Sequence, residues 1–332
     1  MLLTFYAVEL LRNGKLSAAL TKLKGEDIVL FIAIAASMAT GVLLPSFGII
    51  FEPYLLIWLG LLLFLNLIRL NLQDLASTFK KPVQLVILSM VKLVALPLTM
   101  YFIAKLVYEP LAVPVLLLSG ISTGLGAPFV INAVEKSKKL PLVVGMVIVT
   151  SLGVPFALPS IVYLLLGGNS EFEIPIFNMV FLLSVALFIP IIAGWFAKKK
   201  WSSIAQRVDK KSFPVSIVLI SLMNLGVFAN FSSFFFKDLS FVFVNIAAAF
   251  ALFAAYAAIG YVAGNIKYQG KIITMERSRD LGISGLIVMT YVNNILVVVF
   301  ASQFFSIDVA ALAAFYNLPY YGLILLLKII AK

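Results

Sequence analysis

The chain has 332 residues, of which 63% are hydrophobic and 12% charged, and its mean hydropathy of +1.11 is far above that of a soluble globular protein. Cys and His are both absent, which excludes disulfides, thiolate chemistry and the usual imidazole metal ligands. The net charge of +11 lies in short basic clusters between apolar runs, a pattern typical of cytoplasmic loops rather than of a nucleic-acid-binding surface.

The first 27 residues begin with an apolar stretch, and their positive charges follow it. A signal peptide has the reverse order. Leu16, Ala19, Leu20 and Leu23 lie on one face of a helix with lysines opposite, which favours an amphipathic helix on the cytoplasmic membrane surface. A partly ordered tail is the alternative interpretation.

Ten segments after residue 27 are long enough to cross a membrane, which takes about 20 apolar residues. They predict an all-α polytopic membrane protein with ten transmembrane helices, at residues 28–46, 53–72, 82–107, 111–134, 140–166, 175–197, 213–236, 240–265, 272–303 and 308–331.

The basic residues predict the orientation of these helices. All but three of the 25 Lys and Arg residues fall on one side of the membrane, and the exceptions are Lys92, Lys105 and Lys237. Cytoplasmic loops carry such an excess, so both termini are expected in the cytoplasm and the chain in the plasma or inner membrane.

The spans divide into two halves of five, residues 28–167 and 175–331, on either side of an acidic loop. Because five is odd, homologous halves would have opposite orientations, which is the inverted-repeat construction of secondary transporters. The fourth span of each half contains a Gly-Ile-Ser run, at residues 120–122 and 282–284. These glycines, with Pro128 after the first run, predict a break in each helix and a binding site where the breaks meet.

Lys92 is predicted in the middle of a membrane segment, about 15 Å from the start of its span at about 1.5 Å per residue. An ammonium at that depth needs a partner or a wet cavity. It is therefore a candidate charge in a transport site, or part of a structural ion pair between two helices. Asp280, beside the second Gly-Ile-Ser run, is the preferred partner, and Glu276 is the alternative.

Further groups near the predicted breaks are candidates for binding a substrate. The N-terminal ends of broken helices attract anions, and hydroxyls or amides in such spans either line a site or hold helices together. No metal site and no cofactor are expected. The substrate-binding candidates are Ser122, Thr123, Gly124, Pro128, Ser284, Gly285, Asn294 and Asn317.

Several motifs resemble those of the bile acid:sodium symporter family, in the same order along the chain. They are Leu72–Leu75, Phe79–Pro97, Gly126–Asn132, Thr150–Pro155 with Pro159, Ser284–Leu286 and Tyr316–Leu318. The resemblance covers about residues 28–330. It implies that the fourth and ninth helices are broken and cross within a core domain, which packs on a panel domain of helices 1, 2, 6 and 7. It also implies an organic-anion substrate, such as a bile acid, pantoate or a keto acid, driven by two sodium ions.

The chain departs from the family pattern where the family binds sodium. Phe129 and Val130 replace a Ser-Asn pair, and hydroxyl positions in the fifth helix fall on Val143 and Val147. Lys92 stands where the family has a glutamine, so its ammonium could supply the positive charge that sodium otherwise brings. If burial leaves the amine neutral, it could instead carry a proton.

Together these features predict a secondary active transporter of an organic anion, working by alternating access without sodium. The expected partners are the substrate and the lipid bilayer, without nucleic acid, and the protein can act as a monomer. The alternatives are a sensor or binding protein that no longer cycles, a sodium-coupled symporter, and a channel. An intramembrane enzyme is disfavoured because no nucleophile–base pair is visible, and an arsenite exporter because Cys is absent.

Overall fold

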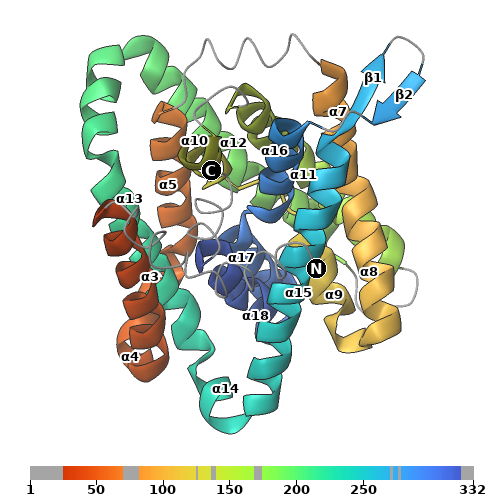
Figure 1. Cartoon of the computed structure of the whole chain (residues 1–332). Coiled ribbons are helices and arrows are strands. Elements are labelled where there is room, and N and C mark those ends of the chain that lie inside the picture. The colour runs from red at the N-terminus through yellow and green to blue at the C-terminus, as the bar shows by residue number, and fades with distance from the viewer. Residues whose placement is uncertain are drawn as a thin grey trace, which may run out of the picture.

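The computed structural model describes residues 25–69, 82–124, 126–135, 140–167, 174–269, 272–275 and 278–322. Most of these residues are helical (Figure 1). The first half contains α3 (Gly25–Leu43), α4 (Pro45–Gly48), η1 (Ile49–Tyr54), α5 (Leu55–Arg69), α7 (Pro82–Met90), η2 (Val91–Ala95), α8 (Leu96–Val107), η3 (Glu109–Leu111), α9 (Ala112–Gly120), α10 (Gly126–Glu135) and α11 (Leu140–Leu166). The second half contains α12 (Ile176–Lys200), α13 (Ser202–Asn230), α14 (Ser232–Lys237), α15 (Leu239–Gly264), β1 (Ile266–Gln269), β2 (Ile272–Met275), α16 (Arg279–Thr290), α17 (Asn294–Phe304) and α18 (Ile307–Phe315).

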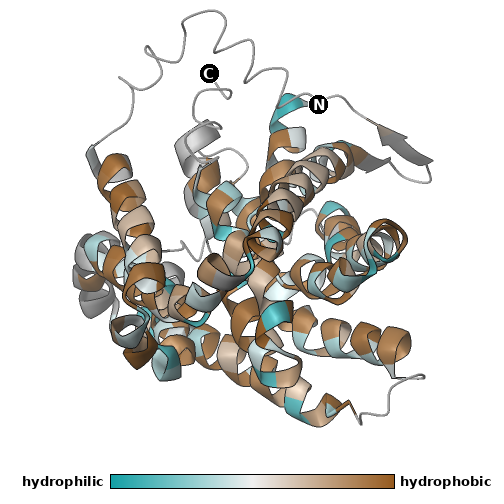
Figure 2. Ribbon diagram, turned by 90° about the horizontal axis from the view of Figure 1, so that it is seen from below, coloured by the Kyte–Doolittle hydropathy of each residue, from teal (hydrophilic) through white to brown (hydrophobic). Residues whose placement is uncertain are grey.

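Long apolar helices identify a multi-pass membrane protein. Large apolar side chains lie on the outside of the molecule, for example Leu106 at 87% and Phe177 at 80% exposure. In Figure 2, apolar residues run along the helices at the periphery as well as through the centre. Such a surface is stable against lipid rather than water. Within the described ranges, five helical segments are each long and apolar enough to cross a bilayer: Pro45–Leu65, Val83–Val107, Leu140–Leu166, Ile176–Lys200 and Leu239–Gly264.

Most of the predicted spans coincide with helices. The prediction at 140–166 is α11 itself, and the prediction at 82–107 is the continuous run of α7, η2 and α8. The tenth predicted span begins with α18 and is described as far as residue 322. Of the predicted amphipathic segment, residues 1–24 lie outside the described residues. The relation of the two halves as inverted repeats stays a prediction.

The ninth predicted span is wrong at its start. Residues 272–275 form β2, which pairs antiparallel with β1 in a hairpin at one end of the bundle (Figure 1), and α16 begins only at Arg279. The β-branched run Ile272-Ile273-Thr274 favours an extended conformation. The all-α expectation therefore holds for the apolar helices, with one short hairpin added to it.

The helices form two groups. The helices α3, α5, α12 and α13 pack on one another, and we call them the panel. The core consists of α8, α9, α11, α15, α16, α17 and α18, which are also linked to one another by contacts. In Figure 1, α3, α5 and α13 lie on the left, and α8, α9 and α15 on the right. The four helices of the panel correspond to the predicted helices 1, 2, 6 and 7, and the division into a core domain and a panel domain stays a prediction.

Facing glycines bring α15 and α16 close together. A Cβ atom on Gly260 or Gly285 would collide with the backbone carbonyl oxygen of the other residue, and one on Gly264 with that of Leu281. Helices in lipid associate through van der Waals packing, so small residues at such contacts allow their backbones to approach. The second Gly-Ile-Ser run therefore lies within a continuous helix and contributes to helix packing.

Candidate functional site

Two broken helices cross at their breaks. Residues 121–124 follow the end of α9 before α10 begins at Gly126, and residues 291–293 separate α16 from α17. Thr123 in the first break and Val292 in the second form an isolated antiparallel bridge. The prediction that both helices are broken and cross is therefore confirmed.

Backbone hydrogen bonds join the two breaks on either side of this bridge. Gly124 N donates to Tyr291 O at 2.6 Å, and Asn293 N donates to Ser122 O at 3.1 Å. A helix break frees backbone groups that water cannot reach inside a bilayer, where each unpaired group is costly. At this crossing each break supplies hydrogen-bond partners to the other.

Side chains and a close backbone approach hold the crossing in place. Thr123 Oγ1 donates to Val288 O of α16 at 2.9 Å, and Thr123 N donates to Thr150 Oγ1 of α11 at 3.0 Å. A Cβ atom on Gly124 would lie 2.6 Å from Val292 O. Glycine is thus required at residue 124 by the approach of the second break.

The second break lies beyond the Gly-Ile-Ser run that was expected to cause it. Ser284 Oγ donates to Asp280 O of its own helix at 2.7 Å, and Gly285 packs on α15. The helix remains intact there because close packing on α15 accommodates its glycines. Ser284 and Gly285 accordingly lie in the helical part of α16, rather than in the break.

Lys92 is buried beside the first break. It lies in η2, a π-helical segment between α7 and α8, and its side chain is 0% exposed. Its Nζ donates to Ser119 O of α9 at 2.9 Å and lies 5.7 Å from the centre of the Tyr256 ring of α15. This distance is within the range of a cation–π contact. Short π-helical segments are frequent at functional sites, and this one places an amine among three helices.

The expected ion pair between Lys92 and Asp280 is absent. Asp280 is exposed in the first turn of α16, whereas Lys92 is buried against α9 and α15. A carboxylate in the first turn is favoured by the positive end of the helix and by hydration, so it needs no buried partner. Glu276, the alternative partner, lies outside the described residues.

Ser119 O is well placed to accept from a cation. Ser119 is the second-to-last residue of α9, whose final carbonyl groups lack helical partners and carry partial negative charge. A charged amine at Lys92 would neutralise this end of the half-helix. A backbone carbonyl therefore takes the place of the carboxylate that the sequence suggested.

The loss of the family's sodium sites stays a prediction. Ion sites replace the hydration shell with several oxygen atoms, but Lys92 Nζ already uses Ser119 O. Val143 and Val147 of α11 are buried and offer no side-chain oxygen. Elsewhere in the described part of the chain, no three Asp, Glu, His or Cys side chains gather as metal ligands.

Polar side chains also gather at the crossing. Asn294, the first residue of α17, donates from Nδ2 to Oδ1 of Asn317, which follows α18. Asn317 Nδ2 and Ser122 Oγ are buried and have no hydrogen-bond partner among the residues that the structure describes. Pro128 is buried in the first turn of α10. Ser122, Thr123, Gly124 and Asn294 thus lie in or next to the breaks, and Asn317 is bonded to this group.

Three polar residues of the site were not predicted as site residues, although Thr150 and Tyr316 lie in motifs that resemble the family. Thr150 accepts from the first break, Tyr256 faces Lys92, and Tyr316 donates from its hydroxyl to Thr290 O at the end of α16, at 2.8 Å. Each carries a hydroxyl group inside an apolar run, which was the available signal. Packing or lipid contact is a more common role for aromatic residues in such runs.

Comparison with known families identifies the family of the chain. The model of the sodium bile acid symporter family matches residues 56–237, which is more than half of the chain and includes Lys92 and the first break. No individual curated protein matches the chain. The chain belongs to the sodium bile acid symporter family, a family of membrane transporters.

Proposed function

We propose that this protein is a secondary transporter of an organic anion that needs no sodium, because the ammonium group of Lys92 replaces a sodium ion. The observation that carries this proposal is the hydrogen bond from buried Lys92 Nζ to Ser119 O beside the crossing. A tethered cation there balances the partial negative charge at the end of α9 without an ion from solution. If the amine releases its proton during the cycle, the same group couples transport to protons.

The substrate would bind at the crossing with its anionic group near the half-helix N-termini. Both α10 and α17 begin next to a break, and N-terminal helix ends carry partial positive charge. The unpartnered Ser122 Oγ and Asn317 Nδ2 are available to hydrogen-bond a carboxylate or sulfonate. Thr123, Gly124, Pro128 and Asn294 would shape this site rather than bind the charge.

Transport would follow from a rocking motion of the core against the panel. In this proposal the ten spans form two inverted repeats, as in other secondary transporters, and the crossing lies near the middle of the membrane. The hydrogen bonds between the breaks support movement of the core as one body. The panel would act as the fixed support against which the site opens to either side.

Ligand binding and uptake together test this proposal. A thermal-shift screen of organic acids, with and without sodium, should find an acid that stabilises the protein equally under both conditions. Proteoliposomes should then take up that acid down its own concentration gradient when potassium replaces sodium on both sides. Strict sodium dependence would contradict the proposal. Binding without counterflow would instead indicate a sensor, and a current far above carrier turnover would indicate a channel.

A further inference from the structure

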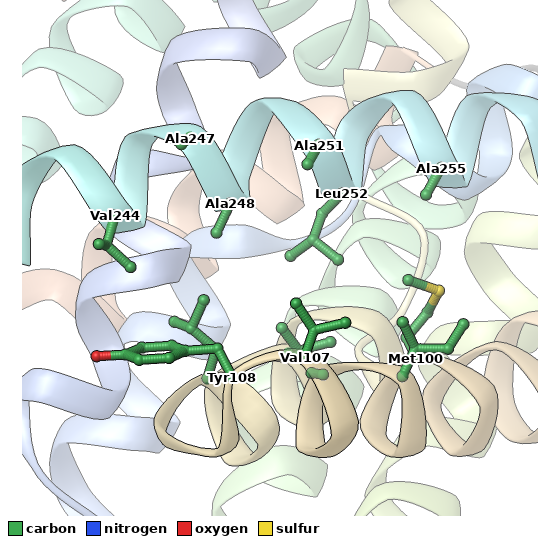
Figure 3. A pocket seen from close by; sticks show the side chains of 13 residues that line it. Met100, Val107, Tyr108, Val244, Ala247, Ala248, Ala251, Leu252 and Ala255 are labelled. Carbon is green, nitrogen blue, oxygen red and sulfur yellow. The ribbon is translucent and has the colours of Figure 1, made fainter. Parts of the chain in front are cut away.

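A groove lies between α8 and α15 on the side of the core away from the panel. Its volume is about 540 Å³, within the range of about 300–1,000 Å³ typical of sites for small molecules. Figure 3 shows Val244, Ala247, Ala248, Ala251, Leu252 and Ala255 of α15 facing Met100, Val107 and Tyr108 across it. Apart from the hydroxyl of Tyr108, the side chains that line it are apolar.

Alanines create this hollow. Four of the lining residues on α15 are Ala247, Ala248, Ala251 and Ala255, whose methyl groups do not reach α8. Farther along α15, glycines let α16 pack directly against the same helix. Beside α8 no other helix of the described residues covers these small residues, so the space between α8 and α15 stays open in this part of the chain.

The position of the groove indicates that its opening faces the hydrocarbon of the membrane. Both walls belong to helices that are long and apolar enough to cross a membrane. The groove also continues into side chains that face outward, since Ile103, Val107 and Val244 line it and are 46%, 80% and 40% exposed. Lipid chains rather than water therefore lie against its opening.

The length of the groove matches one leaflet of a bilayer. From Val244 to Ala255 the helix rises about 16 Å at about 1.5 Å per residue, and half of a hydrocarbon core of about 30 Å is about 15 Å. Tyr108 lies at the end near Val244, and in Figure 3 its hydroxyl points away from the groove. Tyrosines favour the interface between hydrocarbon and headgroups.

We propose that this groove is a binding site for one acyl chain of a membrane phospholipid, whose headgroup lies at the Tyr108 end. The inner end of the groove lies close to the candidate site, because Ala255 precedes Tyr256, whose ring faces Lys92. Val115, which also lines the groove, is one helical turn before Ser119 on α9. A bound chain would therefore set the spacing of α8 and α15 where Lys92 lies between them.

Native mass spectrometry tests this site directly. Delipidated protein in detergent is titrated with palmitoyl-oleoyl phosphatidylglycerol, and bound lipids are counted for the wild type and for Ala251→Leu, which places a larger side chain in the groove. The variant should lose the tightest lipid adduct, with an affinity lower by at least about fivefold. Ala258→Leu is the matched control, because Ala258 is exposed on the same helix but does not line the groove. It should bind lipid as the wild type does.

Two outcomes would overturn the proposal. One is equal lipid binding by the wild type and both variants while all three keep the same melting temperature. The other is a dimer of the wild type that Ala251→Leu dissociates without a loss of bound lipid, which would assign the groove to a second copy of the chain. If Ala251→Leu lowers the melting temperature, the experiment is repeated with Ala248→Leu, which also places a larger side chain in the groove. The same two outcomes would then overturn the proposal.

Discussion

At the scale of single residues, the site combines one buried amine with the free carbonyl end of a half-helix. Lys92 Nζ has Ser119 O as its hydrogen-bond acceptor and the face of Tyr256 as its neighbour. A charged group inside a membrane is costly and is usually functional. The carbonyl group carries only partial charge, so the pair differs from a salt bridge in that no carboxylate holds the amine in place.

A second interaction at this scale is the bond from Thr123 to α16. In Thr123→Val, Val288 O would lose the hydrogen bond that it accepts from the Thr123 hydroxyl. The amide of Val292, which would bond to Val288 O in a continuous helix, donates to Thr290 O and so does not replace it. We expect the free energy of unfolding to fall by about 1–3 kcal/mol, the cost of a buried group left unpaired. Reversible unfolding in mixed detergent micelles measures this change.

Thr290→Val is the control for this measurement. Thr290 is equally buried, but its hydroxyl bonds back to Leu286 O within its own helix, so its loss leaves the crossing intact. Equal stability losses in the two variants would show that the Thr123 bond contributes nothing specific to the crossing.

At the scale of elements, the fold depends on two helices that break and pair with each other. The breaks form a short antiparallel ladder centred on Thr123 and Val292. This pairing explains how the chain tolerates non-helical backbone at a depth where water cannot satisfy it. It also joins α9 and α10 to α16 and α17 as one unit.

The crossing can be tested by a disulfide, because the chain has no native Cys. Thr123 and Val292 oppose each other without a direct hydrogen bond, and such pairs have Cα atoms about 4.5 Å apart, within disulfide range. The double variant Thr123→Cys with Val292→Cys should therefore oxidise within one chain and resist alkylation. Thr123→Cys with Ser284→Cys should stay reduced. Cross-linking of the second pair alone would place the crossing at the Gly-Ile-Ser run instead.

The sequence could predict the existence of the breaks better than their positions. The first break lies at its predicted position, in the Gly-Ser-Thr run, because Gly124 lies where the two broken segments touch. At the second, the residues Tyr291, Val292 and Asn293 carry no local signal for a break, which depends on contacts with a segment far away in the sequence. The burial of Lys92 followed from its depth in an apolar run. The hydrogen-bond acceptor of Lys92 could not be predicted in the same way, because the carbonyl of Ser119 becomes free only where α9 ends at the break.

At the scale of the whole molecule, the panel and the core are separate packing groups with contacts between α11 and α12 and between α5 and α17. The β1–β2 hairpin lies at one end of the bundle and α14 at the other (Figure 1). The distribution of basic residues predicts that the hairpin end faces the cytoplasm. This orientation fixes which leaflet meets the groove between α8 and α15.

Sidedness is measured by labelling single cysteines with a membrane-impermeant maleimide. Met275→Cys on β2 should react in inside-out vesicles only, and Phe236→Cys on α14 in right-side-out vesicles only. Both native residues are exposed, at 66% and 70%, and lie outside the apolar helices Pro214–Asn230 and Leu239–Gly264. The opposite pattern would reverse the predicted topology.

The central claim, that Lys92 replaces a sodium ion, is tested most directly by uptake of an organic anion into proteoliposomes with potassium as the only alkali cation. We expect the wild type to transport at the same rate as in sodium. Lys92→Gln, which removes the charge but keeps a polar side chain, should be slower by at least about tenfold. Lys105→Gln, at an exposed lysine of α8, should match the wild type. Transport by Lys92→Gln at the wild-type rate, or a wild type that works only in sodium, would contradict the account.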